Sequence, residues 1–204
     1  MDHNNILAVV LAGGKSKRFG RDKSQVKLGS KILIDYILTE IIDLYKDILI
    51  VTNEPIKYLN SNKISITSDV KKGLGPLGGV FTAMKWVKDN NKDYQWISSF
   101  PSDSPFFTKN ELKVFYNNID MQKKKLFFIK SKNTRHNIFG LWSLDLLDKL
   151  ELDLQRGERK VEVWANTVDA QIIDIDHSER DPFFNINTKE DLEKAYKILK
   201  HDKL

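Results

Sequence analysis

The chain has 204 residues, of which 41% are hydrophobic and 30% are charged. This length and composition predict one globular domain, residues 1–204, that buries about 70% of the surface of its unfolded chain. The sequence has no run of about 18 apolar residues and begins with a polar stretch, so a membrane partner and a secretory leader are not expected and a cytoplasmic protein is predicted. With no cysteine, disulfides and thiolate chemistry are excluded, and the four scattered histidines do not form a metal motif. Any metal is therefore expected on oxygen ligands.

The formal net charge of +5 is compatible with an anionic small molecule or with a nucleic acid. A nucleic-acid surface favours a continuous basic stripe, whereas the basic residues here form separate clusters. These clusters are Lys15 to Lys23, Lys71 with Lys72, Lys123 to Lys125, and Lys130 with Lys132. The pattern favours a small-molecule substrate, with no nucleic acid as partner.

The first predicted element is an apolar strand, Ile6 to Val10, that runs directly into a glycine-rich loop ending at Lys23. Gly13 and Gly14 lack a Cβ, so the backbone can turn sharply and bring N–H groups to phosphate oxygens. The same loop supplies positive charge from Lys15, Lys17, Arg18, Arg21 and Lys23. A phosphate site is predicted here, with an ordinary strand-to-helix turn and a solvated basic surface as the alternative.

Helices and strands alternate after this loop. Apolar residues recur at helical spacing from Leu33 to Leu44, and short apolar strands follow at Ile48 to Val51 and Ile64 to Thr67. This alternation predicts an α/β fold with a mostly parallel, Rossmann-like sheet and helices on both faces. Ligands of such sheets gather at the carboxyl ends of the strands, where Asn53 and Asp69 fall beside the glycine loop. Both could equally serve as turn or helix-cap residues.

The segment from Gly73 to Gly78 formally matches Gly-x-Gly-x-x-Gly and precedes a predicted helix from Gly79 to Asp89. A dinucleotide site is rejected because residues 69–72 separate the glycines from the strand, and because Pro76 stiffens a segment that should enter a helix. The segment is instead predicted to be a loop whose backbone lies against a nucleobase.

The next predicted strand, Tyr94 to Phe100, delivers Asp103 between Pro101 and Pro105 to the same edge. The prolines preorder this loop, and Mg²⁺ on nucleotide phosphates needs only one or two protein carboxylates. Asp103 is therefore the predicted Mg²⁺ ligand, with a simple turn residue as the alternative.

The last elements complete the predicted sheet and its helical layers. Thr108 with Glu111 and Thr188 with Asp191 are predicted helix caps, and Trp86, Trp96, Trp142 and Trp164 are predicted core residues. Strands are predicted at 126–129 and 138–142, and the polar connection from Ser131 to His136 favours an antiparallel pair. The other predicted elements are helices at 144–154 and 157–167, a strand at 172–175 and a final helix to Leu199.

The loop from Leu11 to Lys23 matches every fixed position of the nucleotidyltransferase signature Leu-Ala-Gly-Gly-x-Ser-x-Arg-x-Gly-x-Asp-Lys. It resembles most closely the loop of the molybdenum cofactor guanylyltransferases, the MobA-like nucleotidyltransferase family, with Phe19 where that family usually has Met. Further matches occur in family order along nearly the whole chain, at Asn53, Asp69, Gly75-Pro-Leu77, Asp103-Ser-Pro105, Gly157-Glu-Arg159 and Asn185-Ile-Asn-Thr188.

The resemblance implies a three-layer α/β/α enzyme that joins GMP from GTP to the phosphate of molybdopterin or Mo-molybdopterin and releases pyrophosphate, with Mg²⁺ as cofactor. It assigns catalysis to Arg18, Lys23 and Asp103. It assigns nucleotide binding to Leu11, Ala12, Gly13, Gly14, Lys15, Lys23, Asn53, Asp69, Gly75, Pro76, Leu77 and Asp103. Pterin binding is expected at Arg159, which could pair with the substrate phosphate, and at Asn185 and Asn187, which share one side of an extended segment.

Three alternatives stay open. A cytidylyl- or sugar-phosphate nucleotidyltransferase would share the loop, a non-catalytic pterin carrier would bind without releasing pyrophosphate, and a nucleic-acid module would show steep salt dependence. Transient contact with other cofactor-biosynthesis proteins is also compatible with the sequence.

Overall fold

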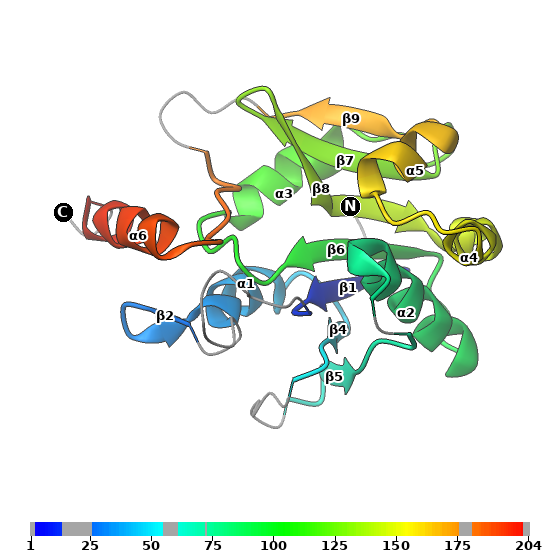
Figure 1. Ribbon diagram of the computed structural model, residues 1–204, viewed down its shortest axis with the longest axis horizontal. Coiled ribbons are helices and arrows are strands. Elements are labelled where there is room, and N and C mark those ends of the chain that lie inside the picture. The colour runs from blue at the N-terminus through cyan, green and yellow to red at the C-terminus, as the bar shows by residue number, and fades with distance from the viewer. Residues whose placement is uncertain (1–2, 14–25, 55–60, 72, 176–180, 202–204) are drawn as a thin grey trace.

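The computed structural model describes residues 3–13, 26–54, 61–71, 73–175 and 181–201. Its centre is a seven-stranded sheet with the strand order β5-β4-β1-β6-β8-β7-β9, as Figure 1 shows. The strands are β1 (Ile6–Leu11), β4 (Ile48–Val51), β5 (Ile64–Thr67), β6 (Trp96–Pro101), β7 (Leu126–Ser131), β8 (Thr134–Ser143) and β9 (Gln171–Asp174), and β2 (Lys27–Leu28) pairs separately with β3 (Lys31–Ile32). The helices are α1 (Leu33–Ile41), α2 (Gly75–Asp89), α3 (Lys109–Asn117), α4 (Leu147–Gln155), α5 (Val161–Thr167) and α6 (Lys189–His201), with a short 3-10 turn η2 (Leu144–Leu146).

The directions of the strands determine which strand ends lie at the same edge of the sheet. β8 runs antiparallel to β6 and β7, while the pairs β1–β4, β1–β6, β4–β5 and β7–β9 are parallel. The turn between β7 and β8 has positive φ at Lys132 (43°) and Asn133 (62°), as a tight two-residue hairpin requires. All strands except β8 therefore end at one edge of the sheet, and the predicted mostly parallel α/β fold with an antiparallel hairpin is confirmed.

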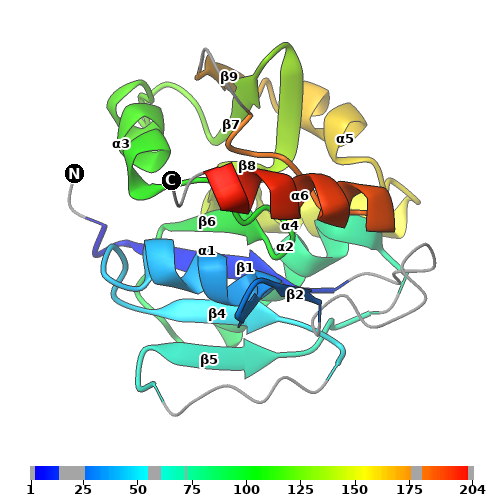
Figure 2. The same ribbon diagram turned by 90° about the vertical axis from the view of Figure 1, so that its left-hand side faces the viewer.

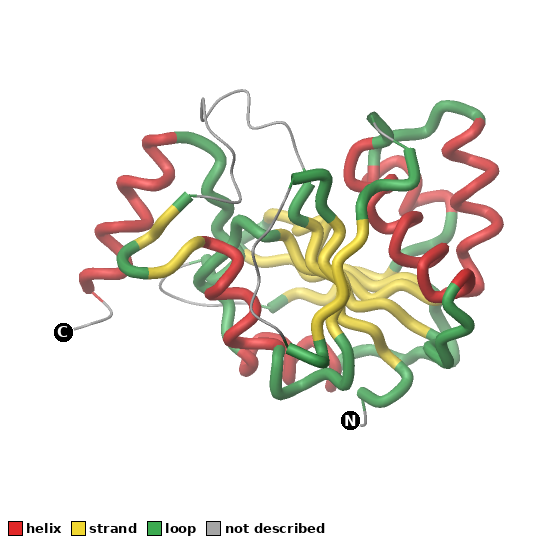
Figure 3. The backbone as a smooth tube through the Cα atoms, turned by 90° about the horizontal axis from the view of Figure 1, so that it is seen from below, coloured by secondary structure: helices red, strands yellow, loops and turns green. Residues whose placement is uncertain are grey.

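Side-chain alternation places helices on both faces of the sheet. In β1, Ile6, Ala8 and Val10 join a buried cluster with residues of α1 and α3. Leu7 and Val9 point the other way, into a cluster with α2, α4 and α5. Figure 3 shows the strands between these two helical layers.

A smaller apolar cluster lies beyond the end of the sheet, where α6 packs on the β2–β3 hairpin and α1 (Figure 2). It includes Leu28, Phe106 and Ile186, all buried. The Tyr196 hydroxyl of α6 also donates to the Lys27 carbonyl at 3.2 Å. The C-terminal helix is thereby attached to the segment that follows the signature loop.

Two predicted helix starts were wrong and two predicted caps were right. α2 begins at Gly75 rather than Gly79, because Pro76 sits in the first turn, where no backbone N–H is needed. α5 begins at Val161 rather than Gly157, whose φ of 98° belongs to the turn that ends α4. The capping boxes at Thr108 and Thr188 are both formed. Within the described ranges, none of the helices has the length and apolar character to cross a bilayer.

The predicted core tryptophans also agree with the fold. Trp96, Trp142 and Trp164 are buried, and Trp86 packs partly buried against the cluster on the α2 side.

Candidate active site

The site begins where β1 and β6 end side by side. Leu11 pairs with Pro101, and the Ser102 amide donates to the Leu11 carbonyl at 3.3 Å. The residues that follow each strand, Gly13 and Asp103, therefore leave the sheet from neighbouring positions at its carboxyl edge. Helix α2 approaches this point closely, since a Cβ on Gly79 would lie 3.0 Å from a methyl carbon of Leu11. Leu11, Ala12 and Gly13 are thus placed between the Asp103 loop and the start of α2.

Asn53 and Asp69 form a reciprocal pair across the ends of β4 and β5. The Asn53 Nδ2 donates to Asp69 Oδ2 at 2.7 Å, and the Asp69 amide donates to Asn53 Oδ1 at 3.2 Å. A Cβ on Gly13 would lie 3.8 Å from the same Asp69 oxygen. The structure therefore brings Gly13, Asn53 and Asp69 together, as their strand-end positions predicted.

The Gly75-Pro-Leu77 segment is the first turn of α2, with Gly75 and Pro76 exposed and Leu77 buried. The prediction that this segment is a loop is wrong, because its backbone forms the N-terminus of α2. Gly75 has a φ of 65°, and a Cβ there would lie 3.6 Å from the Arg159 carbonyl oxygen. A segment expected to hold the nucleobase is thus next to one expected to hold the pterin.

The backbone around Arg159 is held by the preceding glutamate. The Glu158 carboxylate accepts from the Lys160 and Arg159 amides at 2.8 and 2.7 Å, and these bonds lower its pKa. The Arg159 Nη1 donates to the carbonyls of Leu154 and Glu158 at 2.7 and 2.6 Å. One nitrogen of the guanidinium therefore holds the side chain to its own loop. Among the contacts between described residues, Nη2 and Nε are not used, and they are the groups that could meet a phosphate.

The C-terminal asparagines lie against the Asp103 loop, although they are far from it in sequence. The Ile186 amide donates to the Asp103 carbonyl at 2.9 Å, and the Ser104 hydroxyl donates to Asn185 Oδ1. Ile186 is buried while Asn185 and Asn187 are exposed, which confirms that the two asparagines alternate away from the core. We call these two bonds between the Asp103 loop and the asparagine segment the joint. The sequence did not predict the role of Ser104 in it, because nothing around a serine between Asp103 and Pro105 indicates its distant partner.

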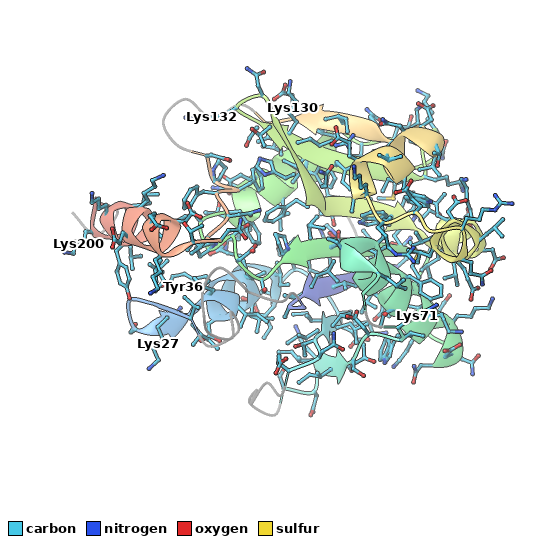
Figure 4. The ribbon with its side chains drawn as sticks, in the orientation of Figure 1. Lys27, Tyr36, Lys71, Lys130, Lys132 and Lys200 are labelled. Atoms are coloured by element: carbon cyan, nitrogen blue, oxygen red, sulfur yellow. The ribbon has the colours of Figure 1, made fainter. Side chains whose placement is uncertain are left out.

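Four predicted site residues, Gly14, Lys15, Arg18 and Lys23, lie outside the described residues. Among described lysines, Figure 4 shows Lys130 and Lys132 at the β7–β8 hairpin, Lys27 and Lys200 near α6, and Lys71 near α2. Lys130 is paired with Asp174 at 2.7 Å. These positive charges are spread over separate parts of the surface.

The described part of the chain holds no cluster of three or more His, Cys, Asp or Glu side chains suited to a metal. A Mg²⁺ ion held largely by nucleotide phosphates and water needs only one or two carboxylates, and it prefers oxygen ligands. Asp103 offers such a carboxylate beside the glycine loop. The donor set therefore fits a nucleotide-bound Mg²⁺ rather than a metal held by the protein alone.

Comparison with known proteins places this chain in a family. A family model described as the MobA-like NTP transferase domain matches residues 8–169. A molybdenum cofactor guanylyltransferase of Rhizobium rhizogenes is 32% identical, over 97% of this chain and 94% of that protein. A probable molybdenum cofactor guanylyltransferase of Aquifex aeolicus is 27% identical, over 94% of this chain and 90% of that protein.

Solved structures share the fold. Molybdopterin-guanine dinucleotide biosynthesis protein A of Archaeoglobus fulgidus superposes with a TM-score of 0.76 at 22% identity, covering 96% of this chain and 99% of that one. A CMP:2-keto-3-deoxy-manno-octonic acid synthetase complexed with CTP gives a TM-score of 0.73 at 9% identity, covering 98% of this chain and all of that one (100%). The predicted family is confirmed by the sequence matches, and the chain belongs to the MobA-like NTP transferase family.

Proposed function

We propose that the protein transfers GMP from GTP to the phosphate of molybdopterin, releasing pyrophosphate and forming the guanine dinucleotide cofactor. Relatives that span nearly the whole chain carry the name molybdenum cofactor guanylyltransferase. The observation that carries the proposal is the joint between the Asp103 loop and the Asn185–Asn187 segment. These bonds join the loop proposed to hold the metal to the segment proposed to hold the second substrate, which supports a transfer between two bound substrates.

The reaction joins two anions, so the chain must hold both and offset their charge. A phosphate oxygen of the pterin substrate attacks the α-phosphorus of GTP, and the bond to the β-phosphate oxygen breaks. Backbone N–H groups from Gly13 to Lys15, together with Arg18, would bind the outer phosphates. Lys23 would stabilise the charge that grows around the α-phosphorus. No protein base is needed, because the attacking phosphate is already ionised near pH 7.

The nucleoside would lie across the ends of β4 and β5 and the start of α2. The Asn53–Asp69 pair, which is exposed at Asn53, would offer an amide and a carboxylate to the nucleoside. Gly75, Pro76 and Leu77 would present backbone groups to the base at the α2 N-terminus. Asp103 would hold Mg²⁺, which when bound neutralises charge on the GTP phosphates.

The second substrate would lie against the C-terminal segment. Asn185 and Asn187 each offer an amide donor and acceptor, which suits the edge of a pterin ring. The free end of the Arg159 guanidinium would pair with the pterin phosphate. Because the Arg159 carbonyl lies close to Gly75, the two substrates would meet between α2 and the Asp103 loop.

The test is a pyrophosphate-release assay with each of four nucleoside triphosphates, with and without molybdopterin. The CTP-bound synthetase has the same fold, so the fold does not choose the base and all four nucleotides are needed. We expect release only with GTP, Mg²⁺ and molybdopterin together. Release with CTP or with a sugar phosphate as acceptor would reassign the substrates, and binding of both ligands without release would make the protein a carrier.

A further inference from the structure

A buried polar cluster connects the β7–β8 hairpin to the C-terminal segment. The Ser131 Oγ lies 2.8 Å from His136 Nε2 and 2.6 Å from Asp181 Oδ1. The Phe183 amide donates to that same Asp181 oxygen at 3.0 Å. Ser131 is fully buried and the His136 side chain is 8% exposed, so water does not compete freely for the bond between them, while the Asp181 side chain is 27% exposed. Three chain segments are thereby joined by side chains.

The chemistry of the groups sets the direction of each bond. An ionised carboxylate only accepts, so the single Ser131 proton is directed to Asp181. The Ser131 oxygen must then accept from His136, whose Nε2 carries a proton. Burial lowers the pKa of His136, although the Asp181 charge opposes this shift, and the neutral imidazole supplies the one N–H that the chain of bonds needs. Donation runs from His136 through Ser131 to Asp181.

This arrangement is not a hydrolytic triad. In a triad the carboxylate binds the other ring nitrogen of the histidine and the serine hydroxyl is exposed to substrate. Here the carboxylate takes the serine proton itself, and the serine is fully buried. The cluster therefore has no nucleophile to present, and its role lies in holding the segment that begins at Asp181.

That segment is fixed on both sides of its exposed asparagines. Upstream, the buried Phe183 ring lies 5.0 Å from the His136 ring and 4.8 Å from the Phe139 ring. At the asparagines themselves, Ile186 and Asn185 are bonded to the Asp103 loop, and downstream the Asp191 carboxylate accepts from the Asn187 and Thr188 amides. Figure 1 shows this orange segment descending from the β7–β9 side of the sheet toward α6. The path of residues 181–187 is therefore held upstream by the β7–β8 hairpin as well as at the Asp103 loop.

We infer that His136 is a positioning residue for the second substrate: through Ser131 and Asp181 it sets the path of residues 181–187 and thereby presents Asn185 and Asn187 to a phosphorylated pterin. The substrate part of this inference rests on the proposed function. The positioning part rests on the hydrogen-bond chain alone. Loss of this hydrogen-bond chain would leave the Asp181 charge less well paired and would allow residues 181–187 to move. This movement would lower the affinity for the ligand that the asparagines bind.

The experiment compares three substitutions with one control. His136→Phe keeps an aromatic ring against Phe183 but removes the donor, His136→Gln keeps a donor near the position of Nε2, and Ser131→Ala interrupts the chain at its middle. Tyr116→Phe is the matched control, because Tyr116 is buried and its hydrogen bonds to Ser98 and Tyr45 do not involve residues 181–187.

Two readouts separate the two parts of the inference. Amide hydrogen exchange at Phe183 and Ile186 reports the segment without any ligand, and we expect it to become at least about tenfold faster in His136→Phe and Ser131→Ala, and near the parent rate in His136→Gln. The KM for molybdopterin should rise about tenfold in the first two variants, with the GTP KM within about twofold. Tyr116→Phe should move neither value.

The outcomes are distinct. Unchanged exchange at both amides in His136→Phe and Ser131→Ala overturns the positioning role, whatever the ligand. Faster exchange with an unchanged molybdopterin KM in an active parent overturns the substrate part. A parent that releases no pyrophosphate with GTP and molybdopterin overturns the proposed function, and the exchange result still decides the positioning role.

Discussion

The two halves of the site are built differently. The nucleotide half consists of residues that directly follow parallel strands, Gly13 after β1, Asn53 after β4 and Asp103 after β6. The C-terminal half consists of an extended segment that belongs to no strand and is held by side chains from the Asp103 loop and the β7–β8 hairpin. Sheet pairing positions the strand ends of the first half, and the Asn53–Asp69 bonds join two of these ends. The second half depends on a few specific hydrogen bonds.

This contrast has a functional consequence. Residues at strand ends move only if the sheet moves, so they suit the groups that must meet the α-phosphorus with little error. A segment held by side chains can be displaced by single substitutions. We therefore expect substitutions in the nucleotide half to change turnover, and substitutions in the C-terminal half to change affinity for one substrate.

The largest effect is expected at Asp103. Asp103→Asn keeps the size of the side chain but removes the charge that would hold Mg²⁺, so kcat at saturating GTP should fall about tenfold to a thousandfold. The measurement is pyrophosphate release across a range of Mg²⁺ concentrations.

The matched control is Asp174→Asn, which removes a carboxylate at the end of β9 that pairs with the exposed Lys130. Its turnover should stay within about twofold of the parent, since exposed ion pairs contribute little. If Asp103→Asn at high Mg²⁺ matches the parent, Asp103 is only a turn residue.

How much of this was predictable from sequence differs between the halves. The strand-end residues could be predicted because hydrophobic periodicity locates the strands, and parallel strands bring their carboxyl ends to one edge. The alternation of Asn185 and Asn187 was also readable from an extended pattern. The bonds from Ser104 to Asn185 and from Ser131 to Asp181 span 81 and 50 residues, and nothing local in the sequence marks either serine.

The helix starts show a second limit. Pro76 argued against a helix in the sequence, yet it occupies the first turn of α2, where its missing N–H has no cost. Whether a proline begins a helix or precludes one depends on where that helix starts. Here α2 begins at Gly75, and the helix packs so closely on β1 that a Cβ on Gly79 would lie 3.0 Å from a methyl carbon of Leu11, which is a tertiary contact.

After Asp103, the next largest effect is expected at Asn185 and Asn187, whose substitutions should change the kinetics in different ways. Asn187→Ala removes an exposed amide without breaking the bond from Ser104, so the molybdopterin KM should rise about tenfold while kcat and the GTP KM change by less than about twofold. Asn185→Ala also removes the acceptor of the Ser104 hydroxyl beside Asp103, so it should lower kcat as well. Steady-state kinetics with each substrate varied separately measures both. Identical values of kcat and KM for the two variants would contradict the role given to the bond between Ser104 and Asn185.

A smaller effect is expected at the nucleotide half's own side-chain pair. Asn53→Ala breaks the reciprocal bonds with Asp69 and removes the amide offered to the nucleoside. The loss of one hydrogen bond to GTP costs about 1 kcal/mol, so the GTP KM should rise about fivefold with the molybdopterin KM unchanged. Asn118→Ala is the control, because that amide bonds only to the Val114 carbonyl at the end of α3 among the contacts described. A rise in the molybdopterin KM in Asn53→Ala would mean that the nucleotide half also affects binding of the second substrate.

The smallest effect concerns pH and the stability of the C-terminal half. Burial lowers the pKa of His136 below its ordinary value of about 6.5, with Asp181 as the charged group that opposes the shift. The unfolded chain therefore binds this proton at a higher pH than the folded chain. The stability that the neutral imidazole provides is complete above about pH 6.5 and is lost as the pH falls through the lower folded-state pKa, with a slope of at most about 1.4 kcal/mol per pH unit for one proton.

Chemical unfolding at about pH 7.5 and about pH 5.5 measures this contribution, because other titrating groups cancel between the parent and a variant. His136→Gln should lose less stability on acidification than the parent. Tyr116→Phe is the control: burial raises the pKa of Tyr116 to about 12, so this group does not titrate in the interval and its removal should shift stability equally at both pH values. Equal losses in the parent and His136→Gln would show that His136 is no harder to protonate in the folded chain than in the unfolded chain, and that burial does not hold the imidazole in its neutral, donating form.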